Sequence, residues 1–290
     1  MKQKVAFLGL GVMGYPMAGW LSKHGYSVVV YNRTDSVAVR WLQAYQGQSA
    51  ASPAEAVVDA EIVFSCVGND DDVRAVLLGE QGALSYMQAG AVLVDHTTTS
   101  ATLARELAAA AATVNCGFID APVSGGQQGA ENGKLTVMCG GHGNDFQRVE
   151  AAIKSYAKSI QLMGEAGSGQ LCKMVNQICI AGVVQGLAEG INFAKRAGLD
   201  AAQVIDVISK GAAQSWQMEN RAKTMVRDEF EFGFAVEWMR KDLAICFEEA
   251  KRNGAQLPMT EMVDKFYEEV VAMGGKRWDT SSLIARLRKD

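Results

Sequence analysis

The chain has 290 residues, 49% of them hydrophobic, and a formal net charge of -4. A chain of this length exceeds the size at which single hydrophobic cores usually stop growing, so we expect two domains. The slight negative charge gives no electrostatic reason to expect nucleic acid or a membrane surface as a partner. No basic segment precedes an apolar stretch at the N-terminus, and no uninterrupted apolar run reaches membrane-spanning length. These features predict a soluble, cytoplasmic protein.

The six cysteines are scattered along the chain and form no C-x-x-C pair. In a chain of this length without a signal segment, that usage indicates reduced thiols of a cytosolic protein. The three histidines are too few and too dispersed for a metal cluster. We therefore expect no metal site.

A strand-helix-strand pattern opens the chain between Lys4 and Ser36. The expected strands are Val5–Leu8 and Val28–Tyr31, and an apolar helix between them extends to about His24. The turn after the first strand reads Gly9, Leu10, Gly11, Val12, Met13 and Gly14. In this spacing the first glycine makes a tight turn, the second admits a pyrophosphate, and the third lets helix and strand pack closely. The helix N-terminus then directs its N–H groups at the phosphates, so the segment predicts a dinucleotide site rather than an ordinary glycine-rich turn.

The residues after the second expected strand indicate which dinucleotide is bound. An NAD site usually has an acid here for the ribose hydroxyls, but this chain has Asn32, Arg33 and Thr34, with no acid before Asp35. Asn32 would not repel a 2′-phosphate, Arg33 can pair with it, and the Thr34 hydroxyl can add a hydrogen bond. NADP is therefore the preferred cofactor and NAD the alternative. A solvated loop charge is the other interpretation of Arg33.

Strands and helices continue to alternate through the first half of the chain. An alanine-rich helix is expected at Pro53–Asp59, and further strands at Glu61–Val67, Ala91–Asp95, Phe118–Asp120 and Leu135–Cys139. Such alternation predicts the α/β class, with a largely parallel sheet and helices on both faces.

Ligands of such sheets bind outside the carboxyl ends of the strands. Val67 and Asn69 follow one strand end and Thr98 another, so these residues are candidates to contact the ribose or nicotinamide side of the cofactor. The neighbouring Thr99 and Ser100 can equally be N-caps of the next helix.

The chain changes character after Met163. A glycine-rich loop at 164–169 leads into apolar residues at helical spacing, which predict a helix of about 25–28 residues that ends at Gly198. Later helical segments are expected at Ala201–Lys210, Trp216–Val226, Val236–Asn253, Pro258–Ala272 and Ser281–Leu287. We therefore predict a Rossmann domain at 1–163 and an all-helical domain at 164–290.

Three further motifs accompany the glycine fingerprint: 120–126, with glycines at 129 and 133; 169–176; and 238–243. Together, in this order and over essentially the whole chain, they resemble the β-hydroxyacid dehydrogenase family. That family includes 3-hydroxyisobutyrate dehydrogenases, tartronate semialdehyde reductases and glyoxylate/succinic semialdehyde reductases. The resemblance implies a Rossmann domain, a helical domain, an active site in the cleft between them, and a homodimer or homotetramer formed through the helical domain.

The resemblance also implies roles for particular residues. The segment Ser124-Gly125-Gly126 holds the substrate carboxylate in the family, and its hydroxyl and unobstructed N–H groups suit that task. A glycine turn before the next strand is the simpler interpretation. Lys173 corresponds to the general acid/base at the substrate oxygen, and Asn176, on the same helix face, to the residue that orients substrate or lysine.

By the same resemblance, Lys241 reaches the cofactor side of the cleft and Asp242 supports it; an exposed charge pair is the alternative. Trp216, Gln217, Asn220 and Arg221 are candidates to select the substrate, and equally candidates for core and surface positions.

The expected function is hydride transfer between NADP(H) and a small acid with a hydroxyl or carbonyl group β to its carboxylate, or slightly farther. 3-Hydroxyisobutyrate, tartronate semialdehyde, succinic semialdehyde and glyoxylate exemplify this class. An imine-reducing relative is an alternative, although the lysine is changed in those proteins. A catalytically silent NADP-binding or protein-interaction module is the other.

Overall fold

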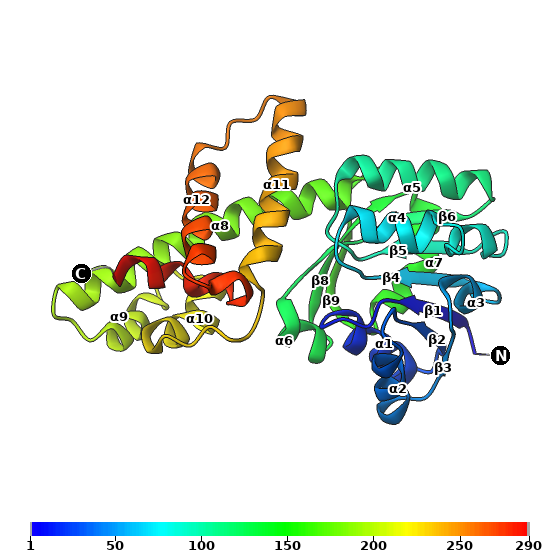
Figure 1. Cartoon of the computed structure of the whole chain (residues 1–290), viewed down its shortest axis with the longest axis horizontal. Helices are drawn as coiled ribbons and strands as arrows, with labels where there is room; N and C mark the ends of the chain where they lie inside the picture. Colours follow the sequence, from blue (N-terminus) through cyan, green and yellow to red (C-terminus); the bar gives the residue numbers. More distant parts are fainter. Residues whose placement is uncertain (1, 289–290) are drawn as a thin grey trace. The chain divides into compact units, whose positions relative to one another are not determined.

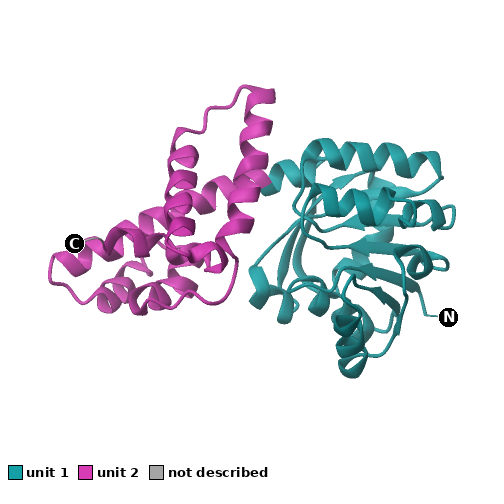
Figure 2. Cartoon of the chain, viewed as in Figure 1, with its two compact units in different colours: residues 1–173 teal, residues 174–290 magenta. Residues whose placement is uncertain are grey.

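The computed structural model describes residues 2–288 of the chain, which divides into two compact units, residues 1–173 and 174–290 (Figure 2). The first unit is built from a sheet and helices, and the second is all-helical, as the sequence predicted (Figure 1). Helix α8, Ser168–Arg196, begins in the first unit and continues in the second.

Among the residues that the structure describes, the first unit contains a nine-stranded sheet of the order β3-β2-β1-β4-β5-β6-β8-β7, with β9 beside β8. Its strands are β1 Lys4–Leu8, β2 Ser27–Tyr31, β3 Gln48–Ser49, β4 Ile62–Ser65, β5 Val92–Asp95, β6 Gly117–Asp120, β7 Val123–Ser124, β8 Leu135–Gly141 and β9 Ala157–Leu162. Strands β1 to β6 are parallel, whereas β8 is antiparallel to β6 and β7. The order reverses between β1 and β4, which is the point where dinucleotides bind to such sheets.

Helices cover both faces of this sheet. They are α1 Gly14–Lys23, α2 Asp35–Ala44, α3 Pro53–Val57, α4 Asp70–Leu78, α5 Ala101–Thr113, α6 Gly126–Glu131 and α7 Gly143–Ile153, with a 3-10 turn, η1, at Leu84–Tyr86. Alternate residues of β1 explain the two layers: Val5 and Phe7 pack toward α1, α2 and α7, while Ala6 and Leu8 pack toward α3, α4 and α5. Because both faces are buried, the central strands are almost wholly apolar.

The second unit packs the later part of α8 against shorter helices. These are α9 Ala201–Ile208, α10 Trp216–Arg227, α11 Val236–Asn253 and α12 Pro258–Ala272, followed by the 3-10 segments η2 Gly275–Arg277 and η3 Thr280–Arg288. Ala181, Val184, Ala188 and Ile191 recur at helical spacing along α8 and are buried in the core of this unit.

Within residues 2–288, α8 is the helix that is long and apolar enough to cross a membrane by length and composition alone, with a mean hydropathy of 1.4 over 18 residues. Its apolar side chains include those that form the core of the second unit. Core helices of globular proteins pass the same test for this reason.

The structure departs from the expected elements in a few places. Helices α2, α4, α6 and α7 and strands β3, β7 and β9 are additional to those predicted. Strand β4 ends at Ser65 rather than Val67, and the expected helix at Ser281–Leu287 lies within the 3-10 segment η3. In α4 the first turn consists of three aspartates, which hides the apolar spacing of Val73 and Leu77. Acids are nevertheless favourable there, because the N-terminus of a helix carries partial positive charge.

Candidate active site

The glycine turn after β1 has the geometry that its sequence predicted. Gly9 has φ +97° and donates its N–H to the Tyr31 carbonyl at 2.8 Å. A Cβ on Gly14 would collide with the Gly9 carbonyl, so the close approach of α1 to the turn requires glycine. In contrast, no atom lies within 4 Å of the place where a Cβ on Gly11 would sit. Gly11 thus leaves open space at the N-terminal side of α1, which fits a pyrophosphate.

Asn32 connects the end of β2 to this turn. Its Oδ1 accepts the Leu10 N–H at 2.9 Å, and its Nδ2 donates to the Thr34 carbonyl at 3.0 Å. Within the turn, Leu10 is buried and Val12 is 58% exposed, while Met13 is half-buried at the N-cap of α1. Asn32 therefore stabilises the conformation of the glycine turn through its side-chain amide. The sequence analysis considered only that Asn32 is neutral and missed this structural role.

Arg33 lies at the surface beside α4. Its side chain is 87% exposed, and Nη1 is 3.5 Å from Asp72 Oδ1. Such an exposed and long ion pair contributes little to stability. Exchanging Asp72 for a phosphate as the partner of the guanidinium would therefore cost little free energy. Thr34 is exposed at the N-cap of α2, and its side chain makes no capping hydrogen bond.

The carboxyl ends of β4 and β5 are fixed by a buried hydrogen-bond network. Asp95 Oδ1 accepts from Ser65 Oγ at 2.8 Å and from Thr97 Oγ1 at 2.7 Å, and Thr97 Oγ1 accepts from the Val67 N–H at 3.0 Å. Burial raises the pKa of the Asp95 carboxyl to about 6, against the lowering effect of these hydrogen bonds. The network holds the backbone at Val67, one of the candidate cofactor contacts.

The other candidates at this edge lie at helix N-termini. Asn69 is the N-cap of α4, where its Oδ1 accepts the Asp72 N–H at 2.9 Å. Ser100 caps α5 in the same way through the Leu103 N–H, as the alternative interpretation anticipated. Thr98 is half-buried two residues before that cap.

The segment Ser124-Gly125-Gly126 connects β7 to α6. Gly125 and Gly126 have φ +126° and +61°, a pair of conformations that residues with a Cβ rarely adopt. A Cβ on Gly125 would lie 3.3 Å from Leu135 Cδ2, whereas the space beside Gly126 is open. Ser124 is half-buried. The backbone conformation thus requires glycine at both positions. Because glycine has no side chain, nothing on these residues would block a ligand from their backbone N–H groups.

Lys173 lies beside this segment. Its side chain is buried, with 7% of the residue exposed, and Nζ donates to the Val123 carbonyl at 2.8 Å. Both residues belong to the first unit. The structure therefore brings the expected general acid/base next to the expected carboxylate-binding segment, and a surface position for this lysine is excluded.

Asp120 and Gln170 hold the start of α8 against the sheet, and neither was singled out from the sequence. Asp120, at the end of β6, accepts the Gly167 N–H at 2.7 Å and the Gln170 N–H at 2.8 Å. The Gln170 side chain donates to the Thr97 carbonyl at 2.7 Å and accepts the Thr99 N–H at 3.1 Å. Burial raises the pKa of Asp120 to about 6, although the backbone N–H groups lower it. The sequence feature that could have identified Asp120 is its position as an acidic residue at the end of a buried strand.

In the second unit, Asn176 belongs to a line of polar contacts. Its Nδ2 donates to Gln177 Oε1 at 2.8 Å, and Gln177 Nε2 donates to Asp242 Oδ2 at 2.6 Å. Lys241 Nζ lies 3.1 Å from Asp242 Oδ1. Asp242 is 2% exposed and the Lys241 side chain 22%, so an exposed charge pair is not what the structure shows. Gln177 was missed in the sequence analysis.

The residues considered for substrate selection include one with a clear structural task. Arg221 lies 3.3 Å from buried Asp279, and its guanidinium is 4.9 Å and 5.1 Å from the ring centroids of Trp216 and Phe232. Asn220 is half-buried and donates to the Trp216 carbonyl. Arg221 therefore stabilises the second unit through an ion pair and cation–π contacts.

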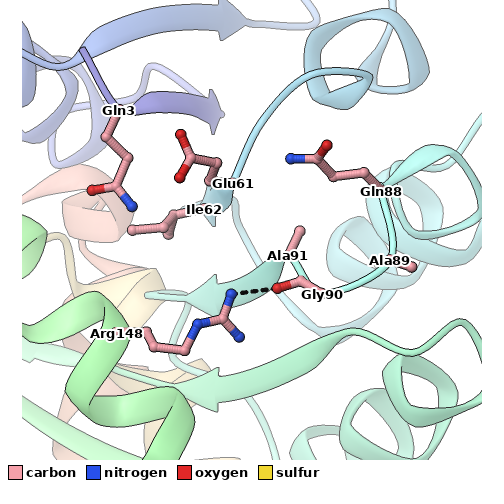
Figure 3. A pocket seen from close by; sticks show the side chains of 8 residues that line it. All are labelled: Gln3, Glu61, Ile62, Gln88, Ala89, Gly90, Ala91 and Arg148. Atoms are coloured by element: carbon pink, nitrogen blue, oxygen red, sulfur yellow. Dashed lines mark hydrogen bonds between the residues drawn. The ribbon is translucent and has the colours of Figure 1, made fainter. Parts of the chain in front are cut away.

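Figure 3 shows a pocket of the first unit that is lined by none of the candidate site residues. It is lined by Gln3, Glu61, Ile62, Gln88, Ala89, Gly90, Ala91 and Arg148. Arg148 extends toward the Gly90 carbonyl and donates to it (Figure 3). Since β4 starts at Ile62 and β5 at Val92, the pocket marks the amino ends of the strands. Ligands of parallel sheets bind at the opposite edge.

Comparison with known proteins covers both units. A family model described as the NAD binding domain of 6-phosphogluconate dehydrogenase matches residues 4–164, and one described as NAD-binding of NADP-dependent 3-hydroxyisobutyrate dehydrogenase matches residues 167–287. An uncharacterized oxidoreductase of Shewanella frigidimarina is 62% identical over 286 residues, which cover 99% of this chain and 98% of that protein.

Two named dehydrogenases are also similar. A probable 3-hydroxyisobutyrate dehydrogenase-like 1, mitochondrial, of Arabidopsis thaliana is 40% identical and covers 99% of this chain, with 85% of its own length matched. The solved structure of Mycobacterium tuberculosis 3-hydroxyisobutyrate dehydrogenase with L-serine matches with a TM-score of 0.89 and 29% identity, over 100% of both chains.

Proposed function

Because the chain belongs to the β-hydroxyacid dehydrogenase family, whose members use NAD or NADP, we propose that it is an NADP-preferring oxidoreductase of small hydroxy or semialdehyde acids. Its substrate carries the hydroxyl or carbonyl group β to the carboxylate, or slightly farther, as in 3-hydroxyisobutyrate, tartronate semialdehyde, succinic semialdehyde or glyoxylate. The single observation that carries this proposal is the contact of Lys173 Nζ with the Val123 carbonyl at 2.8 Å, next to Ser124-Gly125-Gly126.

Lys173 is proposed as the general acid/base. The Val123 carbonyl orients its ammonium group beside the substrate segment. In the direction of reduction Lys173 gives a proton to the substrate oxygen, and in oxidation it takes that proton back. When bound, the nicotinamide supplies or accepts the hydride. Asn176, one helical turn farther along α8, is proposed to orient the substrate or the lysine.

Ser124, Gly125 and Gly126 are proposed to bind the substrate carboxylate. None of the three carries a charge, so a carboxylate would be held by the Ser124 hydroxyl and by backbone N–H groups, with the buried Lys173 ammonium adjacent. The Mycobacterium tuberculosis relative was solved with L-serine, which itself has a hydroxyl group β to a carboxylate. An acid of this kind is what we propose to bind at the segment.

The cofactor would lie on the glycine turn, at 9–14, and along the carboxyl ends of β4 and β5. The open space at Gly11 suits the pyrophosphate, and Val67, Asn69, Thr98, Lys241 and Asp242 are proposed as further contacts. Arg33 and Thr34 are proposed to bind the 2′-phosphate of NADP, because the guanidinium is exposed and only weakly paired.

A substrate panel tests this function. Semialdehyde acids, 3-hydroxy acids and their methyl esters are assayed with NADPH, NADP, NADH and NAD. A site that hydrogen-bonds the carboxylate should lose more than about a hundredfold in kcat/KM with the ester, because its donors are left poorly paired. Equal rates for acid and ester would remove the hydroxy-acid class. Preferential reduction of imines would then favour the imine-reducing alternative, and NADPH binding without any turnover would favour the silent module.

A further inference from the structure

Four polar side chains of the second unit form one continuous line: Asn176, Gln177, Asp242 and Lys241. The heavy-atom distances along it are 2.8, 2.6 and 3.1 Å. Gln177 and Asp242, the two central members, are each 2% exposed. Water cannot readily replace these contacts, and in such surroundings the hydrogen bonds strongly constrain one another.

The charged end of this line determines the orientation of every amide in it. A carboxylate only accepts hydrogen bonds, so Asp242, which is paired with Lys241, requires Gln177 to turn its amide nitrogen toward it. The amide oxygen of Gln177 then faces Asn176, which must donate through Nδ2. The Asn176 oxygen Oδ1 is consequently directed away from Gln177.

An isolated asparagine amide could adopt either of two nearly isosteric orientations. One presents an acceptor and the other presents only donors. The orientation that presents the amide oxygen can accept a hydrogen bond from a lysine N–H or a substrate O–H, whereas the orientation that presents the NH₂ group cannot. The orientation of the Asn176 amide therefore matters for any group that it orients.

We propose that Gln177 is a positioning residue, which transmits the polarity of the Lys241–Asp242 pair to Asn176 and so orients the Asn176 carbonyl oxygen as an acceptor. This inference rests on the proposed function, in which Asn176 orients the substrate or the lysine. Gln177 acts through Asn176 and does not itself touch the reacting atoms.

A charge-swap experiment tests the proposal in the full-length protein. Asp242→Asn removes the fixed acceptor and allows the Gln177 amide to turn over. Gln177→Glu places two carboxylates side by side. In the double variant Gln177→Glu/Asp242→Asn, the new amide at position 242 can donate to the new carboxylate at 177, which still accepts from Asn176. Misorienting a positioned group costs about ten- to a hundredfold in rate, so each single variant should lose that much in kcat, and the double variant should recover most of it.

A variant in a second background shows whether the effect of Gln177 on kcat depends on Asn176, and a further variant serves as its control. In an Asn176→Ala background, Gln177→Glu should lower kcat no further, because the group that it positions is gone. Gln185→Leu is the matched control: Gln185 is buried on the same helix and donates to Glu189 at 2.6 Å, so its loss should change stability and leave kcat unaltered. Thermal unfolding and NADPH fluorescence titration are recorded for every variant.

The possible outcomes distinguish a failure of the role proposed for Gln177 from a failure of the role proposed for Asn176. If Asn176→Ala retains the kcat of the unsubstituted protein, the proposed role of Asn176 is wrong, and the role of Gln177 is overturned with it. If Asn176→Ala loses turnover but the double variant is no better than the single variants, the positioning role alone is overturned. Recovery of kcat in the double variant relative to Asp242→Asn, at the NADPH affinity of that single variant, supports it.

Discussion

The Lys173 ammonium group donates to the Val123 carbonyl at 2.8 Å, across a separation of fifty residues in the sequence. The contact joins the start of α8 to strand β7 within one unit. Asp120 and Gln170 hold the same part of α8 against the ends of the sheet. The lysine is thereby fixed by the fold beside the glycines that we propose as the carboxylate site, and this relationship leads to the first prediction.

Replacing Lys173 by alanine should lower kcat by about 10²–10⁴, the usual contribution of a general acid. NADPH binding, followed by fluorescence titration, should persist, because the glycine turn is untouched. Lys158→Ala is the matched control, since that side chain is exposed on β9. Near-normal turnover of a folded Lys173→Ala protein would contradict the proposed role.

Replacing Arg33 by alanine should raise the KM for NADPH and leave NADH use nearly unchanged. A charge-assisted hydrogen bond contributes about 1.5–3 kcal/mol, which corresponds to roughly a ten- to a hundredfold change. The Arg33 side chain is 87% exposed, so folding should be unaffected. Arg40→Ala, which removes an exposed arginine of α2, is the control. Equal losses with both cofactors would assign Arg33 another role.

Replacing Gly125 by alanine should sharply lower kcat/KM for an acid substrate. The position has φ +126°, and the added Cβ would lie 3.3 Å from Leu135 Cδ2, so the segment must shift. Gly25→Ala is a matched control, because Gly25 has φ +90° with nothing within 4 Å and lies before β2. The control should lose some stability, measured by thermal unfolding, and keep its activity. If both variants lose activity equally, backbone strain and not the carboxylate site is responsible.

The stability conferred by His96 should fall as the solution becomes more acidic. His96 is 2% exposed, contacts the Ala121 carbonyl and the Tyr156 hydroxyl, and burial lowers its pKa from 6.5 to about 4. A depressed pKa means that the unfolded chain takes up the proton first, so the contribution is present above pH 6.5 and is lost between 6.5 and 4. Asp95 and Asp120, whose pKa values are raised from 3.8 to about 6, act in the opposite sense between 6 and 3.8.

A non-titrating variant, His96→Gln, isolates this effect, because the two carboxyls are present in both proteins. The difference in unfolding free energy between the unsubstituted protein and the variant should shrink by roughly 2 kcal/mol from pH 7 to 4.5. Denaturant titrations at several pH values measure it. A difference that stays constant with pH would mean that His96 is not held neutral by burial.

Sequence signals located the elements well where a residue punctuates the chain. Helices α11 and α12 begin and end where predicted, because Pro258 starts one and Gly254, with φ +81°, ends the other. Helix α4 was missed because its first turn consists of aspartates. The periodicity of apolar residues does not reveal a helix whose first turn is polar and is stabilised by its N-cap and by charge.

The sequence by itself determined the α/β order, the glycine turn, the helical second half and the family, since each of these depends on local spacing and on residue types at short range. Only the tertiary structure decided which distant groups meet: Lys173 with Val123, Gln170 with Thr97, and Gln177 with Asp242. Such partners lie tens of residues apart, and a buried polar side chain can be satisfied by any donor or acceptor that packing brings near. The spacing of residues along the chain predicts a helix face or a turn, whereas the partner across the fold depends on how the elements pack.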